Sequence, residues 1–155
     1  MQKKLTLDSV NLLVVDQWLT EEDIQLEEVG KSISSIFYVI NPDLSFRYVN
    51  EAGHHWLNIS QDEKSYRTHT IAEYFHSDTL DIALSQMKRF YELKNTCDLQ
   101  YDLLKVWYTA DDKYKLSLVT TKYSSNLDGF LVTIVPMDEL PHLQERMGYA
   151  VAGNQ

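Results

Sequence analysis

Cysteine is almost absent from this chain of 155 residues, since Cys97 is the one cysteine and no internal disulfide can form. Basic residues are also few, 14 Lys and Arg against 23 Asp and Glu, which gives a formal net charge of −9. Phosphate backbones are bound by clustered Lys and Arg, so this balance argues against nucleic-acid binding by the chain. An acidic surface of this kind is typical of a protein that stays in solution.

Long apolar runs are missing as well. The run from Leu12 to Val15 stops at Asp16 and falls far short of the ~20 apolar residues that a membrane span needs. Met1 is followed by Gln2-Lys3-Lys4 and not by the apolar core of a secretory signal. We therefore expect a soluble, cytoplasmic protein with no membrane partner.

Motifs for catalysis or metal binding are lacking too. The sequence has five glycines and contains no phosphate-binding loop, no Gly-x-Ser-x-Gly and no His-Glu-x-x-His. His54 and His55 are adjacent, and neighbours on a helix point about 100° apart, so the pair does not converge on a metal ion. His76 is expected to make structural hydrogen bonds, and Cys97 to be a small buried side chain at the start of a strand. We predict no enzyme activity, no metal and no cofactor.

What the chain does contain is a compact series of elements between Ser34 and Leu57. Residues 36–40, Ile-Phe-Tyr-Val-Ile, have strand composition, and Asn41-Pro42-Asp43 has turn chemistry. A second strand is predicted at 46–49. Asn50 follows, where its side-chain oxygen can cap a helix over 51–57.

The rest of the chain gives further helices and strands. Ahead of residue 34 we predict about 30 residues of helix, with a second start at Thr20, where Glu21, Glu22 and Asp23 suit the helix dipole. A single turn is predicted at 71–75. A long helix capped by Ser77 follows, with apolar spacing at Leu80, Ala83, Leu84, Met87 and Tyr91. Three strands are predicted near 99–107, 114–118 and 130–135. This grouping favours an antiparallel α+β fold.

The opening series resembles that of PAS domains, in which an apolar strand, a turn with Asp or Asn, a strand ending in Asn and a short helix follow one another. His76-Ser77-Asp78 and the Asp128-Gly129 turn match family positions, so the likeness covers about residues 34 to 138. It implies an α+β fold with a five-stranded antiparallel sheet and helices on one face. We expect an N-terminal helical extension at 1–33, a PAS-like domain at 34–138 and a linker or tail at 139–155.

The resemblance also limits the cofactors and the output. PAS domains that bind haem use a histidine on the long helix, and residues 78–95 have none; flavin photosensors use an Asn-Cys-Arg motif that is missing here. Many PAS domains end in Asp-Ile-Thr, whereas this chain reads Pro136-Met137-Asp138-Glu139-Leu140 and keeps only the aspartate. A short helical segment is expected at 142–147.

Aromatic side chains are the best lead to a site. They either fill the core or line a small-molecule cavity between the sheet and the middle helices. Thr120, Thr121 and Thr133 could offer hydroxyls to a ligand, although β propensity explains them equally well. The predicted ligand-binding residues are Tyr48, Trp56, Phe75, Tyr101, Leu118, Thr120 and Thr133.

The resemblance implies a module that senses a signal and dimerises, and that regulates an output domain outside this chain, such as a helix-turn-helix transcription regulator or a histidine kinase. The N-terminal helix is richer in apolar residues than one sheet face requires, so we expect a homodimer through Val10, Leu13, Val14 and Trp18. Two alternatives remain open. One is a small enzyme or ligand carrier on a cupped α+β fold, and the other is a dimerisation module without a ligand.

Overall fold

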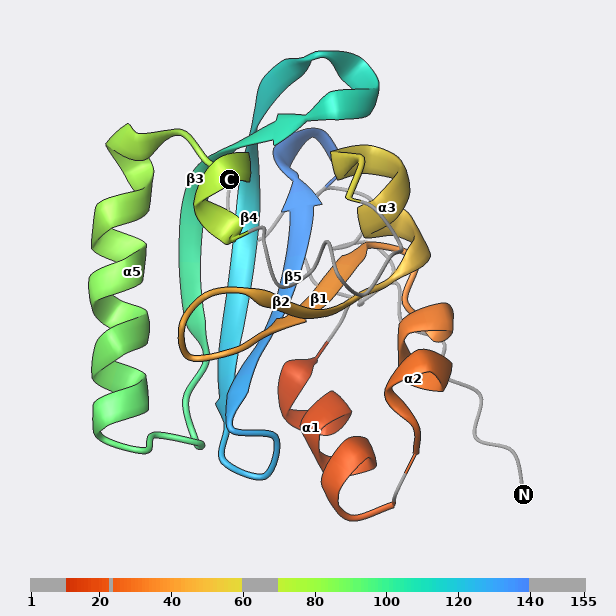
Figure 1. The fold of residues 1–155 in the computed structure, drawn as a ribbon, viewed down its shortest axis with the longest axis vertical. Helices are drawn as coiled ribbons and strands as arrows, with labels where there is room; N and C mark the ends of the chain where they lie inside the picture. The colour runs from red at the N-terminus through yellow and green to blue at the C-terminus, as the bar shows by residue number, and fades with distance from the viewer. Residues whose placement is uncertain (1–10, 23, 60–69, 140–155) are drawn as a thin grey trace, which may run out of the picture.

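The computed structural model describes residues 11–22, 24–59 and 70–139. Its centre is one five-stranded antiparallel sheet with the strand order β2-β1-β5-β4-β3 (Figure 1). The strands are β1 (Ile36–Ile40), β2 (Phe46–Val49), β3 (Gln100–Tyr108), β4 (Lys113–Ser124) and β5 (Gly129–Pro136). The α+β class and the five-stranded antiparallel sheet predicted from the sequence are confirmed.

Helices lie on both faces of this sheet. The helices α3 (Glu51–Leu57) and α5 (Ser77–Glu92), with the 3-10 turn η1 (Ile71–Tyr74), cover the face that we call the inner face. The N-terminal helices α1 (Leu12–Thr20) and α2 (Leu26–Ser32) pack on the opposite, outer face. Figure 1 shows α5 on one side of the sheet and α1 and α2 on the other. Two further 3-10 turns are η2 (Thr109–Asp111) and η3 (Met137–Glu139).

Two hydrophobic cores follow from this arrangement. β1 contributes to both, because Ile36, Tyr38 and Ile40 face the inner core while Phe37 and Val39 face the outer one. Every residue of β1 is therefore buried. A strand covered on both faces reads as a continuous apolar run, which is why Ile-Phe-Tyr-Val-Ile shows no alternation.

Asn50 connects the N-terminal extension to the sheet and to α3. It caps α3, since its Oδ1 accepts a hydrogen bond from the Gly53 N–H at 3.1 Å. The same oxygen accepts from the Phe37 N–H at 3.0 Å. Its Nδ2 donates to the carbonyl oxygens of Ile33 at 3.1 Å and Ser35 at 2.9 Å. The capping role predicted for Asn50 is thus visible, together with a wider role that local sequence does not reveal.

α1 is held on β4 by a buried polar contact. Lys122 Nζ lies 2.8 Å from Asp16 Oδ2, and the Lys122 side chain is 3% exposed. The same ammonium group donates to the Tyr123 carbonyl oxygen at 2.9 Å, and Ser124 Oγ donates to Asp16 Oδ1 at 2.7 Å. Leu12 and Val15, which precede Asp16 in α1, are fully buried against the outer face. This combination fixes α1 to the sheet.

Three local predictions are corrected by the structure. Thr20 ends α1 instead of starting the next helix, which begins at Leu26, because the Ile24 N–H bonds back to Trp18 and the chain turns there. His76, not Ser77, is the N-cap of α5, as its ring accepts from the Asp78 N–H. Cys97 is exposed and lies in the turn before β3, where Asn95 Oδ1 accepts from its N–H.

Candidate ligand site between α5 and the β1–β2 turn

The space between the sheet and α5 is almost completely filled. A cavity of only about 40 Å³ borders Trp56, and the one beneath α5 is about 10 Å³, which is enough for roughly a single water molecule. The cavity beneath α5 is lined mostly by apolar side chains, with Asp102 and Thr121 as its polar members. Burial raises the pKa of the Tyr38 hydroxyl, which therefore stays neutral over the physiological pH range. The inner face is a packed core in this state.

A larger hollow opens beside this core. A groove of about 430 Å³ runs between α5 and the turn that joins β1 to β2. We call it the α5 groove. Its lining is mostly apolar, with one basic and one acidic side chain among its residues: Pro42, Leu44, Leu84, Met87, Lys88, Tyr91, Glu92 and Phe130. Small-molecule sites commonly have this size and composition.

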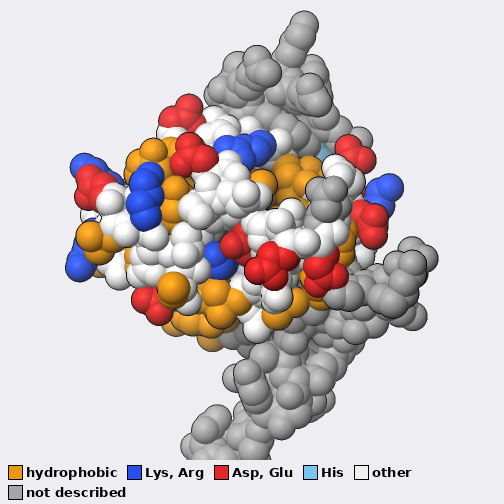
Figure 2. Space-filling view, turned by 90° about the horizontal axis from the view of Figure 1, so that it is seen from below, with side chains coloured by type: hydrophobic (Ala, Val, Ile, Leu, Met, Phe, Trp, Pro, Cys, Tyr) orange, Lys and Arg blue, Asp and Glu red, His pale blue; other side chains and the backbone are white. Residues whose placement is uncertain are grey.

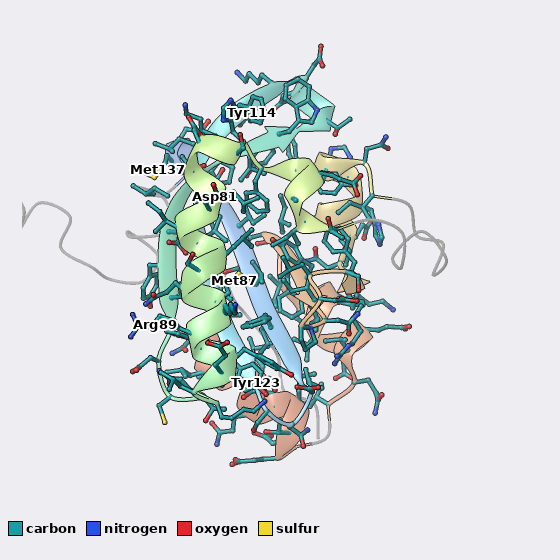
Figure 3. The ribbon with its side chains drawn as sticks, turned by 60° about the vertical axis from the view of Figure 1, so that its left-hand side comes forward. Asp81, Met87, Arg89, Tyr114, Tyr123 and Met137 are labelled. Carbon is teal, nitrogen blue, oxygen red and sulfur yellow. The ribbon has the colours of Figure 1, made fainter. Side chains whose placement is uncertain are left out.

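The α5 wall follows from helical spacing. Leu84, Met87, Lys88 and Tyr91 stand at i, i+3, i+4 and i+7, so they share one side of the helix. The Tyr91 ring packs edge-on against the Tyr123 ring, with 5.6 Å between the ring centroids, and this contact holds Tyr91 in place. In Figure 3 α5 runs in front of the sheet, and the labelled Met87 lies on the side of the helix that faces the rest of the domain.

The opposite wall is a tightly bonded turn. Asp43 Oδ1 accepts from Ser45 Oγ at 2.6 Å and from the Ser45 N–H at 3.0 Å. These bonds hold the pKa of the Asp43 carboxyl below its usual value. Arg47 Nε donates to Asn41 Oδ1 at 2.8 Å and so braces the turn against β2. Leu44 has a φ of 75°, a left-handed conformation that is uncommon for leucine and is found more often at functional sites.

Met87 borders both the packed core and the α5 groove. Methionine has an unbranched and flexible side chain that changes shape at low cost. Among the described residues, Met87 is the one that lines both hollows, and a ligand in the groove could move its side chain without breaking a hydrogen bond. A movement of the Met87 side chain would directly change the packing of the core beneath α5.

Two of the seven predicted ligand residues lie on the inner-face side of the sheet, as expected. Phe75 is buried and borders the cavity beneath α5. Trp56 is half-buried on α3, where its ring packs edge-on against Tyr108 with centroids 6.1 Å apart. Neither residue lines the α5 groove.

The other five lie on the outer face, which corrects their predicted place. The set comprises Tyr48, Tyr101, Leu118, Thr120 and Thr133. Tyr48 packs under α2, since a Cβ on Gly30 would meet its hydroxyl oxygen at 1.8 Å. Around residues 100–103 of β3 and 116–118 of β4 the alternation reverses a simple amphipathic pattern, whereas Leu104, Val106 and Val119 follow it. Polar Gln100 and Ser117 are buried on the inner side, while Tyr101 and Leu103 are exposed. A shift of one residue moves a side chain to the other face, and here the pattern indicated the wrong one.

The lining of the α5 groove was largely missed by sequence reasoning. Leu84, Met87 and Tyr91 were recognised as the buried side of a helix, but nothing in the sequence separates a groove wall from a core wall. Leu44 and Phe130 come from a turn and a distant strand. Only the fold brings these segments together, so no local signal could have found them.

The residues predicted to form a dimer interface differ in their exposure. Leu13 is exposed, whereas Val14 and Trp18 are half-buried and Trp18 packs against the outer core. Val10 lies outside the described residues. Figure 2 shows a face on which hydrophobic side chains lie among both acidic and basic ones.

The two histidines of α3 differ in their surroundings. His54 Nδ1 lies 2.6 Å from the Ile59 carbonyl oxygen, and His55 is exposed. Within residues 11–22, 24–59 and 70–139 no group of three or more His, Cys, Asp or Glu is placed to hold a metal ion. In the same part of the chain no helix is both long and apolar enough to span a bilayer.

Comparison with known proteins identifies the fold. No family model matches the sequence, and no curated protein matches it. Among solved structures, the PAS domain of an HTR-like protein from Haloarcula marismortui is similar with a TM-score of 0.55 at 14% identity, covering 80% of this chain and 98% of that one. The PAS domain of nitrogen regulation protein NR(II) from Vibrio parahaemolyticus has a TM-score of 0.52 at 18% identity, covering 74% of this chain and 100% of that domain. The chain has the PAS fold.

Proposed function

We propose that this chain is a sensor module that takes a small, largely apolar ligand in the α5 groove. The observation that carries the proposal is the groove itself, about 430 Å³ with mostly apolar walls, beside a core that is otherwise filled. The unusual backbone of Leu44 in one wall supports the same reading. The proposed role requires no covalent chemistry.

The proposed response begins at Met87. A ligand against Leu84 and Tyr91 displaces the Met87 side chain, and the packed core beneath α5 must then adjust, because close-packed interiors transmit small shifts. The inner and outer cores share β1 and β5, so the adjustment reaches the surface on which α1 rests. We propose that α1 and the chain ends carry the signal to an output domain outside this chain, such as a transcription regulator in the cytoplasm.

Regulation of such an output accords with the name of one fold neighbour, which is a nitrogen regulation protein. Self-association is part of the proposal. Leu13 on α1 is exposed, and so is Leu116 on the outer face. Exposed apolar side chains of this kind commonly mark an interface. Light scattering of the full chain should give a dimer, and Leu13→Lys should shift it toward the monomer.

The ligand site is tested by NMR with octanol and octanoate as probes. Either probe added to ¹⁵N-labelled full chain should shift the amide signals of Leu44, Leu84, Met87 and Tyr91 in a saturable manner. Leu84→Trp should fill the groove and weaken probe binding at least about tenfold, a loss of about 1.4 kcal/mol.

Ser85→Trp is the matched control. It adds the same ring to an exposed position on the same helix and should leave binding unchanged. Shifts that appear equally in both variants, or that lie outside the groove, would contradict the assignment of the site.

A further inference from the structure

β3 is an edge strand, and part of its free edge has unpaired backbone groups. Lys105 shows which residues point outward, because its N–H donates to Thr79 Oγ1 at 3.3 Å and its carbonyl accepts from the His76 N–H at 2.9 Å. Both partners belong to α5 or its cap, not to β4. Alternate residues of an antiparallel strand direct their backbone groups to the same side. Tyr101 and Leu103 therefore also point their N–H and C=O groups away from β4.

These groups have no hydrogen-bond partner within the described part of the chain. The segment from Tyr101 to Leu103 is thus an open piece of sheet edge, bounded on one side by the contacts of Lys105 with α5. A pair of facing residues of this type in an antiparallel ladder exchanges two hydrogen bonds. Natural sheet edges of this kind are usually shielded, for example by charge, proline or a covering element.

The side chains around this open edge are apolar and exposed. Tyr101 is 61% exposed and Leu103 is 51% exposed, both on the outer face. On the other side of the edge stands α5, where Ile82 is 77% exposed, the highest exposure among the large hydrophobic residues of the described chain. Ile82 lies one helical turn after Thr79, the residue that contacts β3. An added strand would have apolar side chains available on both of its faces.

Charge decides what kind of strand fits. Asp102 stands between the two open positions, is half-buried, and its Oδ2 accepts from Gln100 Nε2 at 2.6 Å. If a second copy paired its own Tyr101–Leu103 segment with this one, so that each Tyr101 faced a Leu103, the two Asp102 carboxylates would face each other. Like charges directly opposite in a ladder are destabilising. A basic residue at that position is favoured instead.

We propose that the free edge of β3 at Tyr101–Leu103 binds an extended segment of a partner polypeptide, added as a sixth, antiparallel strand, with apolar residues opposite Tyr101 and Leu103 and a Lys or Arg opposite Asp102. This mode of recognition takes affinity from main-chain hydrogen bonds and specificity from alternate side chains. The site is separate from the α5 groove and does not depend on its occupation.

The probe is the peptide acetyl-Thr-Val-Lys-Val-Thr-amide, added to the ¹⁵N-labelled full chain. Binding should slow hydrogen exchange of the Tyr101 and Leu103 amides and shift their signals, while the amides of Asp102 and Leu104, which point toward β4, should keep their exchange rates. A peptide with Glu in place of Lys should bind about five- to tenfold more weakly.

Leu103→Pro removes one outward N–H that β4 does not use, so the sheet should persist while binding falls at least about tenfold. Leu103→Ala keeps the N–H and is the matched control. Its affinity for the peptide should fall by less than that of Leu103→Pro. Asp102→Asn should abolish the preference for the Lys peptide, and this variant keeps the proposal testable if Leu103→Pro does not fold.

Three results would overturn the proposal. One is peptide binding that leaves the Tyr101 and Leu103 amides unchanged. Another is equal affinity for the Lys and Glu peptides. The third is a concentration-dependent dimer that Leu103→Pro alone abolishes, since that would assign the edge to a second copy of this chain.

Discussion

Lys122 and Asp16 form an ion pair of 2.8 Å that joins β4 to α1, although 106 residues separate them in the sequence. The lysine is 3% exposed and the aspartate 16% exposed, so both charges are largely removed from water. A buried charge is tolerated when it is paired and hydrogen-bonded. The pair therefore determines where the N-terminal extension sits on the PAS fold.

Removal of one partner of this pair should be costly. Asp16→Ala leaves the Lys122 ammonium buried with only the Tyr123 carbonyl, and we expect a loss of about 3 kcal/mol in the free energy of unfolding by urea. The double variant Asp16→Leu with Lys122→Met replaces the pair by apolar groups. Its free energy of unfolding should fall by less than that of either single variant. A single variant within about 0.5 kcal/mol of wild type would show that the pair does not hold α1.

Asn50 should be more important than an ordinary cap. Asn50→Ala orphans the Phe37 and Gly53 N–H groups and the carbonyls of Ile33 and Ser35, so we expect a loss of about 3 kcal/mol or more, against about 1 kcal/mol for a cap alone. Asn50→Asp is the sharper control, since it keeps the acceptor but turns a carboxylate toward these carbonyls. It should be no more stable than Asn50→Ala in urea unfolding, and wild-type stability in either variant would refute the role.

The face assignment of β4 can be tested with adjacent residues. Leu118 is half-buried on the outer face, so Leu118→Trp should change the free energy of unfolding by less than about 0.5 kcal/mol. Val119 is 4% exposed on the inner face, and Val119→Trp should overpack the core and cost roughly 1–3 kcal/mol or more. The opposite order of the two melting temperatures would mean that the strand presents its other face to α5.

The turn beside the α5 groove should respond to acid. The hydrogen bonds from Ser45 lower the pKa of Asp43 below its ordinary value of 3.8, so the folded state binds this proton less readily than the unfolded state does. The resulting stabilisation is present above pH ~4 and is lost as pH falls through the folded-state pKa. We expect Asp43→Asn to reduce the loss of stability between pH 5 and pH 2 by less than about 1 kcal/mol, because the group is exposed. Carbon-detected titration of Asp43 should show a midpoint below 3.8, and a midpoint above that value would contradict the bonds.

The parts of the fold that sequence reasoning predicted are those set by local chemistry. The run Ile36–Ile40, the Asn41-Pro42-Asp43 turn and the Asn50 cap each carry their signal within a few residues. Strand faces were not predictable, because β3 and β4 bury polar Gln100, Ser117 and Thr121 on the inner side. Their outer neighbours Tyr101, Leu103 and Leu116 are apolar and exposed, which reverses the usual alternation in these parts of the two strands.

The α5 groove could not be predicted for a different reason. Its walls come from a turn, a helix and β5, and a groove is defined by the space that these elements leave open. Side chains such as Leu84 and Phe130 look alike in sequence whether they close a core or border a hollow. The same limit applies to the open edge of β3, which depends on where α5 stops covering the strand.

Native mass spectrometry of the full chain purified from cells tests the central claim most directly. We expect wild-type protein to carry a small molecule in addition to its 18.1 kDa polypeptide mass, and Ser85→Trp to carry the same molecule. Leu84→Trp, which fills the α5 groove, should appear at the polypeptide mass alone. An adduct that persists in Leu84→Trp, or bare polypeptide in all three proteins, would contradict the account of this chain as a ligand sensor.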